Sequence, residues 1–228
     1  MTAQKHLVYG IHPVISALNS GRRKVFEVLY TNSTKSKIPE KFINLGRLST
    51  DYEIQTILKK KDVNHQGLLA FCSPLLGKTL KDIKLTKEKS VCLILDNLTD
   101  ITNIGTIIRS GAAFNADFIL YHKTNMPDIL NNEVIIKNSC GGIEEVDLVP
   151  EANIANAVAT LKKNGYWIVG FAGAASQDLK SFSSTNKDLK KIAIILGSEG
   201  KGMRDLTLKL CDFLVKIKIS EKMESLNV

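Results

Sequence analysis

An asparagine and an arginine stand close together in the stretch TNIGTIIRS, residues 102–110, directly after the apolar run 90–96. The run predicts a buried strand, and open α/β sheets bind their ligands beyond the carboxyl ends of such strands. Asn103 could equally cap the helix that begins there. Arg109 lies in an otherwise apolar stretch, where burying a guanidinium without an anion is costly. Because guanidinium is a natural clamp for phosphate, Arg109 is a candidate phosphate-binding residue.

A glycine-rich turn, LGSEGKGM at residues 196–203, follows a second apolar run at 191–197. It is not a Walker A motif, which needs GxxxxGK followed by Ser or Thr, and it is not GxGxxG. The carboxylate of Glu199 would also repel a di- or triphosphate. A ligand without phosphates, such as a nucleoside-like cofactor, fits this turn better. The alternative is a tight strand-to-helix turn that binds nothing.

The other polar residues do not assemble into a recognisable centre. The four histidines show no metal-ligand spacing, and the cysteines, at 72, 92, 140 and 211, form no CxxC motif and no Cys/His cluster. We therefore expect free thiols, no disulfide framework and no metal. The stretch KNSCGG, residues 137–142, is either a loop that closes on a substrate or a simple glycine turn.

Short, continuous apolar runs after residue 90 predict strands that are buried on both faces, as in a parallel sheet. The runs are 90–96, 116–122, 166–172 and 191–197, with a fifth, more alternating run at 212–220. A helical pattern at 153–165 lies between two of them and should stop at Gly165. Strands that alternate with helices predict a doubly wound α/β layer, with the chemistry on the loops after the strands.

The first part of the chain predicts a small α/β domain over residues 1–73. Its expected elements are a helix at 12–20 that ends at Gly21, a strand at 24–32, a helix at 51–60 and a strand at 67–73. Residues 74–89 mix Pro, Gly and many lysines, which is typical of a linker. The remaining domain would span 90–228.

The basic charge is confined to one part of the chain. Residues 1–89 hold 16 Lys/Arg and 7 Asp/Glu, whereas residues 90–228 hold 15 and 16. A basic module joined to a near-neutral one favours a polyanion, such as a nucleic acid, bound by the first part and chemistry performed by the second. The alternative is lysine-rich sequence usage without a partner. No run reaches the roughly 18 apolar residues of a membrane span, and the start lacks a signal-peptide layout, so we expect a cytoplasmic protein with no membrane partner.

Three stretches together resemble the motifs of the SpoU-type RNA 2′-O-methyltransferases of the SPOUT superfamily. They are NIGTIIRS, LGSEGKGM and SLNV, in that order. YGIHPVISAL and NHQGLLA, in the first domain, resemble the RNA-binding domain of the RlmB branch. The resemblance implies an α/β fold with a small N-terminal RNA-binding domain and a parallel-sheet domain that contains a trefoil knot. It also implies a homodimer that uses S-adenosylmethionine and no metal.

The same resemblance implies roles for particular residues. It places the backbone that cradles the cofactor at Gly197, Ile217 and Leu226, and the polar catalytic residues at Asn103, Arg109, Glu199, Ser225 and Asn227. In the family, the motif arginine is usually assigned the role of accepting the proton from the ribose 2′-hydroxyl. Since guanidinium is protonated at ordinary pH, orienting that hydroxyl and binding the adjacent phosphate is chemically easier. Asn103 would order the loop and Arg109, and Glu199 would hold the arginine or the RNA.

The end of the chain departs from the RlmB pattern. The RlmB-type pattern has IPM followed by a Gly- and Ser-rich turn, whereas this segment reads IKISEKMESLNV, with no Pro or Met directly after its first Ile and no Gly. The family's C-terminal helix is expected to be missing after Val228. The expected activity is 2′-O-methylation of a guanosine in 23S rRNA. The alternatives are a tRNA 2′-O-methyltransferase and a non-catalytic RNA-binding or ribosome-assembly protein on the same fold.

Overall fold

The structure is a computed structural model that describes residues 5–60, 63–197, 203–220, 222 and 228. The chain divides into two compact units. Unit 1 comprises Met1–Leu76, Ile104–Ala112 and Asp128–Glu145, and unit 2 comprises Gly77–Asn103, Ala113–Pro127 and Val146–Val228. No helix within the described part of the chain is long and apolar enough to cross a membrane.

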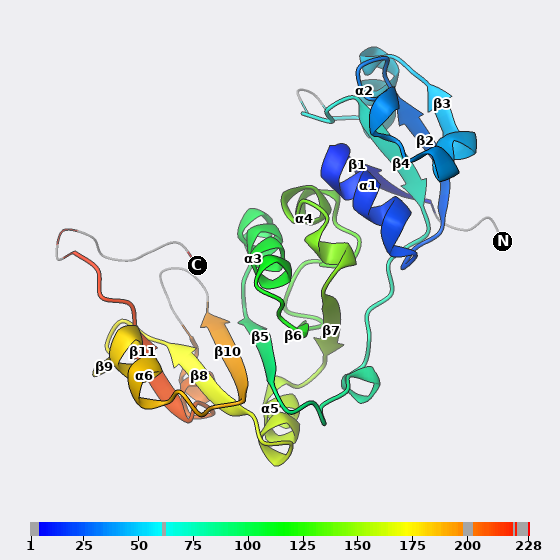
Figure 1. Ribbon diagram of the computed structural model, residues 1–228. Helices are drawn as coiled ribbons and strands as arrows, with labels where there is room; N and C mark the ends of the chain where they lie inside the picture. The colour runs from blue at the N-terminus through cyan, green and yellow to red at the C-terminus, as the bar shows by residue number, and fades with distance from the viewer. Residues whose placement is uncertain (1–4, 61–62, 198–202, 221, 223–227) are drawn as a thin grey trace. The chain divides into compact units, whose positions relative to one another are not determined.

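Unit 2 contains a sheet of seven parallel strands in the order β7-β6-β5-β10-β8-β11-β9 (Figure 1). The strands are β5 (Ser90–Asp96), β6 (Phe118–His122), β7 (Asp147–Glu151), β8 (Trp167–Phe171), β9 (Gln177–Asp178), β10 (Lys191–Gly197) and β11 (Phe213–Lys216). All five predicted runs contain a strand of this sheet, and the predicted α/β fold class is confirmed.

The sequence patterns missed the two edge strands, β7 and β9. β7 contains Pro150, which has no N–H to donate and is therefore tolerated mainly on edge strands. β9 has only two residues and pairs with β11 alone. Neither strand forms a continuous apolar run, because each lies at an edge of the sheet and has a neighbouring strand on one side only.

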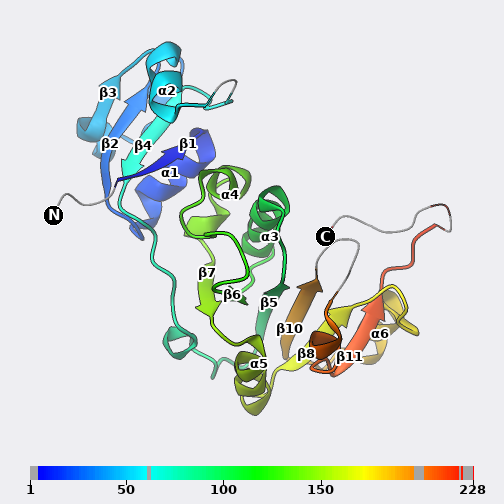
Figure 2. The same cartoon turned by 180° about the vertical axis from the view of Figure 1, so that it is seen from behind.

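Helices and buried apolar side chains fill the space beside the sheet. The helices are α5 (Ile154–Lys163), α6 (Leu179–Thr185), α7 (Asp205–Leu208) and the start of α3 (Ile101–Ala113), and Figure 2 shows α6 beside β11. Asn153 caps α5 by accepting from the N–H of Asn156 at 3.0 Å. Gly165 follows the helix with φ 82°, as the sequence predicted. Phe118, Ile168 and other fully buried residues form the core.

Part of the lysine-rich stretch at 74–89 packs onto unit 2. Leu80, Ile83 and Leu85 contact the core of the sheet, and the N–H of Lys78 donates to the carbonyl of Leu148 at 2.9 Å. The proposed domain limits at residues 73 and 89 stay a prediction.

Unit 1 contains a four-stranded sheet in the order β1-β4-β2-β3. Its strands are β1 (His6–Tyr9), β2 (Val25–Tyr30), β3 (Gly46–Leu48) and β4 (Leu68–Cys72), and its helices are α1 (Ile11–Ser20), α2 (Asp51–Leu58), α4 (Glu133–Asn138) and the middle of α3. Short 3-10 turns lie at η1 (Lys35–Lys37), η2 (Glu40–Leu45) and η4 (Gly142–Glu144), whereas η3 (Leu80–Asp82) belongs to unit 2.

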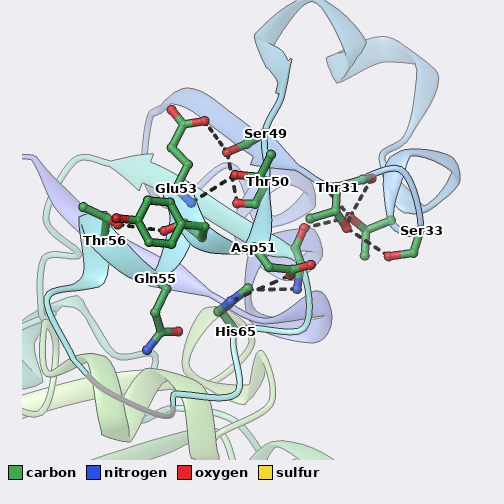
Figure 3. Close-up of polar contacts among 12 residues, drawn as sticks. Thr31, Ser33, Ser49, Thr50, Asp51, Glu53, Gln55, Thr56 and His65 are labelled. Carbon is green, nitrogen blue, oxygen red and sulfur yellow. Dashed lines mark hydrogen bonds and ion pairs between the residues drawn. The ribbon is translucent and has the colours of Figure 1, made fainter.

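Local chemistry explains where the first two helices begin and end. Gly21 ends α1 in the left-handed conformation, at φ 67°, as predicted. Thr50 caps α2 by accepting from the N–H of Glu53 at 3.1 Å, and Ser49 Oγ donates to the Glu53 carboxylate at 2.7 Å (Figure 3). Arg47 also bonds this carboxylate, and together these bonds lower the pKa of Glu53.

All four cysteines are free, and three of them are held as neutral thiols. Burial raises the pKa of Cys72 to about 12 and that of Cys211 to about 11, and it also raises the pKa of Cys92. A raised pKa leaves less thiolate, the reactive form, at any working pH.

We expect Cys72 and Cys92 to resist alkylation by iodoacetamide at pH 8 in the folded protein. Both are fully buried, and a thiol of pKa near 12 carries only about one part in 10⁴ of thiolate at that pH. Mass spectrometry of the labelled peptides measures the result, and labelling in denaturant, which should modify all four cysteines, is the control. Rapid native labelling of either residue would contradict its burial.

Candidate functional site

The helix that carries the first motif, α3, is capped by Asp100. The carboxylate of Asp100 accepts from the N–H groups of Thr102 at 2.7 Å and Asn103 at 3.1 Å. The interpretation of Asn103 as the cap is therefore wrong, because Asn103 lies within the first turn. Its side chain is half-buried, and the ordering role that the resemblance implies stays a prediction.

Arg109 lies in the third turn of α3, and its side chain is exposed. The expectation of a costly buried guanidinium is wrong, so burial gives no argument for an anion there. Arg109 makes no hydrogen bond or ion pair with another residue that the structure describes. At 100° per residue, Asn103 and Arg109 leave the helix about 120° apart, so the helix alone does not bring them together.

Gly105, between these two residues, allows α3 and α4 to pack closely. A Cβ atom on Gly105 would lie 2.6 Å from the Cβ of Asn138 and 2.9 Å from the carbonyl oxygen of Ile135. The glycine of the first motif therefore serves helix packing. The stretch KNSCGG is likewise a glycine turn: Gly141 has φ 93°, and a side chain there would overlap Ser16 of α1.

The carboxyl edge of the sheet in unit 2 brings two predicted cofactor residues together. Gly197 ends β10 and lies opposite Asp96, the last residue of β5. Ile217 directly follows β11, is 49% exposed, and is separated from β10 only by β8. Since parallel strands are spaced about 4.8 Å apart, the ends of β10 and β11 are about 10 Å apart. This is the edge at which open α/β sheets bind ligands.

An ion pair between a buried carboxylate and a partly exposed arginine fixes this edge, and the sequence interpretation missed it. The carboxylate of Asp96 is 1% exposed and accepts from Arg204 Nε at 3.1 Å and Nη2 at 2.5 Å. Arg204 follows the second motif, so the pair ties the end of that segment to β5. The sequence shows an acid that closes an apolar run and an arginine just beyond the motif, but only the parallel register of β5 and β10 brings the two together.

Asn97 adds a polar atom at the same edge. Its backbone is left-handed, with φ 58°, a conformation that asparagine tolerates better than most residues. Its Oδ1 atom is buried and has no hydrogen-bond donor among the residues that the structure describes. A buried acceptor without a donor is costly, so this atom is suited to receiving a hydrogen bond from a ligand or from the neighbouring segment.

The other predicted site residues, Glu199, Ser225, Leu226 and Asn227, lie outside the described residues. The segments of the second and third motifs, on which the implied trefoil knot depends, are therefore described only in part. The roles assigned to these four residues stay predictions.

Comparison with known families matches both parts of the chain. The profile of the SpoU rRNA Methylase family matches residues 90–228. A second profile, RNA 2′-O ribose methyltransferase substrate binding, matches residues 7–76.

Similar proteins align along nearly the whole chain. The 23S rRNA (guanosine-2′-O-)-methyltransferase RlmB of Vibrio cholerae is 32% identical, over 97% of this chain and 91% of the relative. The putative TrmH family tRNA/rRNA methyltransferase YacO of Bacillus subtilis is 30% identical, over 100% and 92%. An AdoMet-bound rRNA methyltransferase from Sinorhizobium meliloti has the same fold, with a TM-score of 0.78, 22% identity and coverage of 98% and 82%. The predicted resemblance is confirmed, and the chain belongs to the SpoU rRNA methylase family.

Proposed function

We propose that this protein methylates a ribose 2′-hydroxyl in RNA with S-adenosylmethionine as the methyl donor. The preferred substrate is a guanosine of the large-subunit (23S) rRNA. The observation that carries the proposal is the alignment of 97% of the chain with an RlmB enzyme, at 32% identity. The basic N-terminal region, matched by a substrate-binding profile, supports RNA as the substrate.

The residues of the carboxyl edge fit the cofactor. When bound, S-adenosylmethionine supplies a methyl group on a positively charged sulfur, which is already a good electrophile. Backbone groups at Gly197, Ile217 and Leu226 would hold it, and the Oδ1 atom of Asn97 offers a buried acceptor for one of its donors. The Asp96–Arg204 pair would keep the second motif at the edge where the cofactor binds.

The chain's own polar residues have a limited chemical task. A ribose hydroxyl is a weak nucleophile, so the protein must align its oxygen and ease the loss of its proton. Arg109 would orient the hydroxyl and bind the adjacent phosphate through its exposed guanidinium. Asn103 would order the start of α3, and Glu199, Ser225 and Asn227 would complete the polar site.

A surface of unit 1 is suited to RNA because it combines cations with aromatic rings. Lys5 Nζ lies 5.6 Å from the centre of the Phe71 ring, and Lys24 Nζ lies 5.5 Å from that of Phe26. Both lysines are exposed and both rings are half-buried. Lysines at such a surface contact phosphates, and rings can stack on unpaired bases.

Lys24→Gln should weaken RNA binding about threefold to tenfold and reduce the slope of log Kd against log salt concentration by about one, because one phosphate contact is lost. Fluorescence anisotropy with a labelled rRNA fragment at several salt concentrations measures both effects. Lys190→Gln is the matched control, since Lys190 pairs with Glu88 on an exposed surface of unit 2. Equal affinity and slope for the Lys24 variant would remove this surface from the RNA interface.

A tRNA substrate is the second candidate, because the Bacillus subtilis relative is described as a tRNA/rRNA methyltransferase. Competition between 23S rRNA and total tRNA, with labelled methyl groups counted in each, separates the two. We expect label in the 23S rRNA, whereas label mainly in tRNA would overturn the preferred substrate. Absence of both S-adenosylmethionine binding and transfer would favour the non-catalytic alternative.

Two further features are proposals: a homodimer, which the family resemblance implies, and a cytoplasmic location, which the sequence patterns favour. Light scattering after size exclusion tests the first. A dimer gives twice the 25.1 kDa of one chain, whereas a value near 25.1 kDa would contradict it. Fluorescence microscopy of a tagged chain would test the second.

A further inference from the structure

A buried ion pair joins two segments of unit 1 that are far apart in the sequence. Arg23 Nε lies 2.7 Å from Glu144 Oε1, and the two side chains are 0% and 1% exposed. Arg23 follows the glycine that ends α1, and Glu144 ends the turn η4 (Gly142–Glu144). The first lies within the substrate-binding profile and the second within the SpoU methylase profile.

The two charges depend on each other. The 2.7 Å contact lacks the alignment of a hydrogen bond, so the attraction is chiefly between charges. Neither Nη1 nor Nη2 of Arg23 has an acceptor among the described residues, while the second oxygen of Glu144 accepts from Ser20 Oγ at 3.2 Å. Removing one partner would leave an uncompensated buried charge, which proteins tolerate poorly. The pair therefore stabilises only the arrangement in which the two segments touch.

Two further polar contacts join the same segments. Lys137 Nζ donates to Gln66 Oε1 at 2.7 Å and lies 5.8 Å from the centre of the Tyr9 ring. Lys60 Nζ forms an ion pair with Glu133 at 2.7 Å. Both contacts are at least partly exposed to water, whereas the pair of Arg23 and Glu144 is fully buried. Removal of one charge should therefore destabilise the connection most at the buried pair.

The segment that carries Glu144 also packs against α3. A Cβ atom on Gly142, two residues before Glu144, would lie 3.1 Å from the Cα of Arg109 and 3.2 Å from the carbonyl oxygen of Ile108. Residues 128–145 thus contact the N-terminal region on one side and the part of α3 that carries Arg109 on the other. Residues 1–76, 104–112 and 128–145 belong to one compact unit.

We infer that Arg23 and Glu144 are positioning residues. Their pair locks the RNA-binding region to the Arg109 segment of the same chain, so that RNA held by that region is presented to Arg109 in a fixed orientation. The functional half of this inference rests on the proposed methyl transfer. The structural half, a rigid connection within unit 1, does not.

The distance between the two parts tests the structural half. Spin labels carried by unnatural amino acids at Tyr52, which is 83% exposed, and at Ser110 of α3 leave the native cysteines unchanged. Pulsed electron paramagnetic resonance should give one narrow distance distribution for the unaltered pair and a broad one for Glu144→Gln. A broad distribution with the pair intact, or a narrow one unchanged in Glu144→Gln, would overturn the lock. Should Glu144→Gln not fold, Glu144→Asp replaces it, because it keeps both charges but shortens the carboxylate by one methylene and so draws it away from Arg23; a distribution as narrow as that of the unaltered pair would again overturn the lock.

Steady-state kinetics test the functional half. Glu144→Gln should raise KM for RNA about tenfold and leave kcat within twofold, because the reacting groups are intact, and the exchanged pair Arg23→Glu with Glu144→Arg should recover part of the loss. Glu88→Gln is the matched control at an exposed pair, and its KM should not change. A KM for Glu144→Gln equal to that of the control would overturn the positioning role. If the unaltered protein transfers no methyl group, the proposed function fails, while the distance measurement still decides the lock.

Discussion

Arg109→Ala should lower methyl transfer to RNA at least a hundredfold and leave the folded protein as stable as before. The loss has the size expected for a positioned catalytic group, about 10²-fold or more. Stability should be preserved because Arg109 is exposed and alanine favours a helix. Single-turnover transfer from labelled S-adenosylmethionine, beside a thermal unfolding curve, measures both quantities.

Arg109→Lys is the informative companion to the alanine variant. Lysine keeps the positive charge but lacks the planar fork that holds a phosphate through two hydrogen bonds. We expect a rate between those of the unaltered protein and Arg109→Ala, with the same dependence on pH as the unaltered protein if Arg109 positions RNA rather than accepting the proton. An undiminished rate for Arg109→Ala would remove this residue from the catalytic site.

Gly105→Ala should destabilise the protein by about 1–3 kcal/mol, the usual cost of forcing extra atoms into a packed interface. Replacing glycine by alanine inside a helix normally stabilises it by about 1 kcal/mol, so helix propensity alone predicts the opposite sign. The new Cβ atom would lie 2.9 Å from the carbonyl oxygen of Ile135. Because that atom belongs to the backbone of α4, relief requires the two helices to separate.

Urea unfolding of the Gly105→Ala variant shows directly whether the substitution lowers or raises the free energy of unfolding. Gly173→Ala is the control, since a Cβ atom there meets no atom within 4 Å and the backbone is not left-handed. We expect the control to unfold at an unchanged or slightly higher urea concentration. A Gly105 variant as stable as the unaltered protein would contradict the close packing of α3 on α4.

The sequence predicted well the features that depend on neighbouring residues. The apolar runs gave β5 and β10 with their observed ends, and glycine ended α1 and α5 where expected. Local signals suffice here because a continuous apolar run and a left-handed glycine each describe one short segment. β7 was missed because its Pro150 is unusual in a strand, and only its place at the edge of the sheet makes it acceptable.

The burial of Arg109 was misjudged although the sequence contained the signal. Ile104, Ile107, Ile108 and Gly111 are buried, and their spacing defines one face of α3. Arg109 lies outside that spacing, so its apolar neighbours in the sequence are not its neighbours in space. The helical period, rather than the composition of the stretch, would have predicted an exposed guanidinium.

The two ion pairs, Asp96 with Arg204 and Arg23 with Glu144, could not be found from local patterns. Asp96 meets Arg204 because β10 lies beside β5 in parallel register, which brings the end of the second motif to the end of β5. Arg23 meets Glu144 because the fold joins segments more than a hundred residues apart. Such pairs depend on topology, and each charged residue alone looks like an ordinary surface residue.

The most direct test of the proposed activity is methyl transfer from labelled S-adenosylmethionine to 23S rRNA, followed by alkaline hydrolysis. A 2′-O-methyl group blocks cleavage of the adjacent phosphodiester, so the label should appear in alkali-resistant dinucleotides that contain guanosine. Label on a base, which alkali releases in mononucleotides, would contradict ribose methylation. Absence of label in any RNA, from a protein that is folded and binds S-adenosylmethionine, would contradict RNA methyl transfer itself.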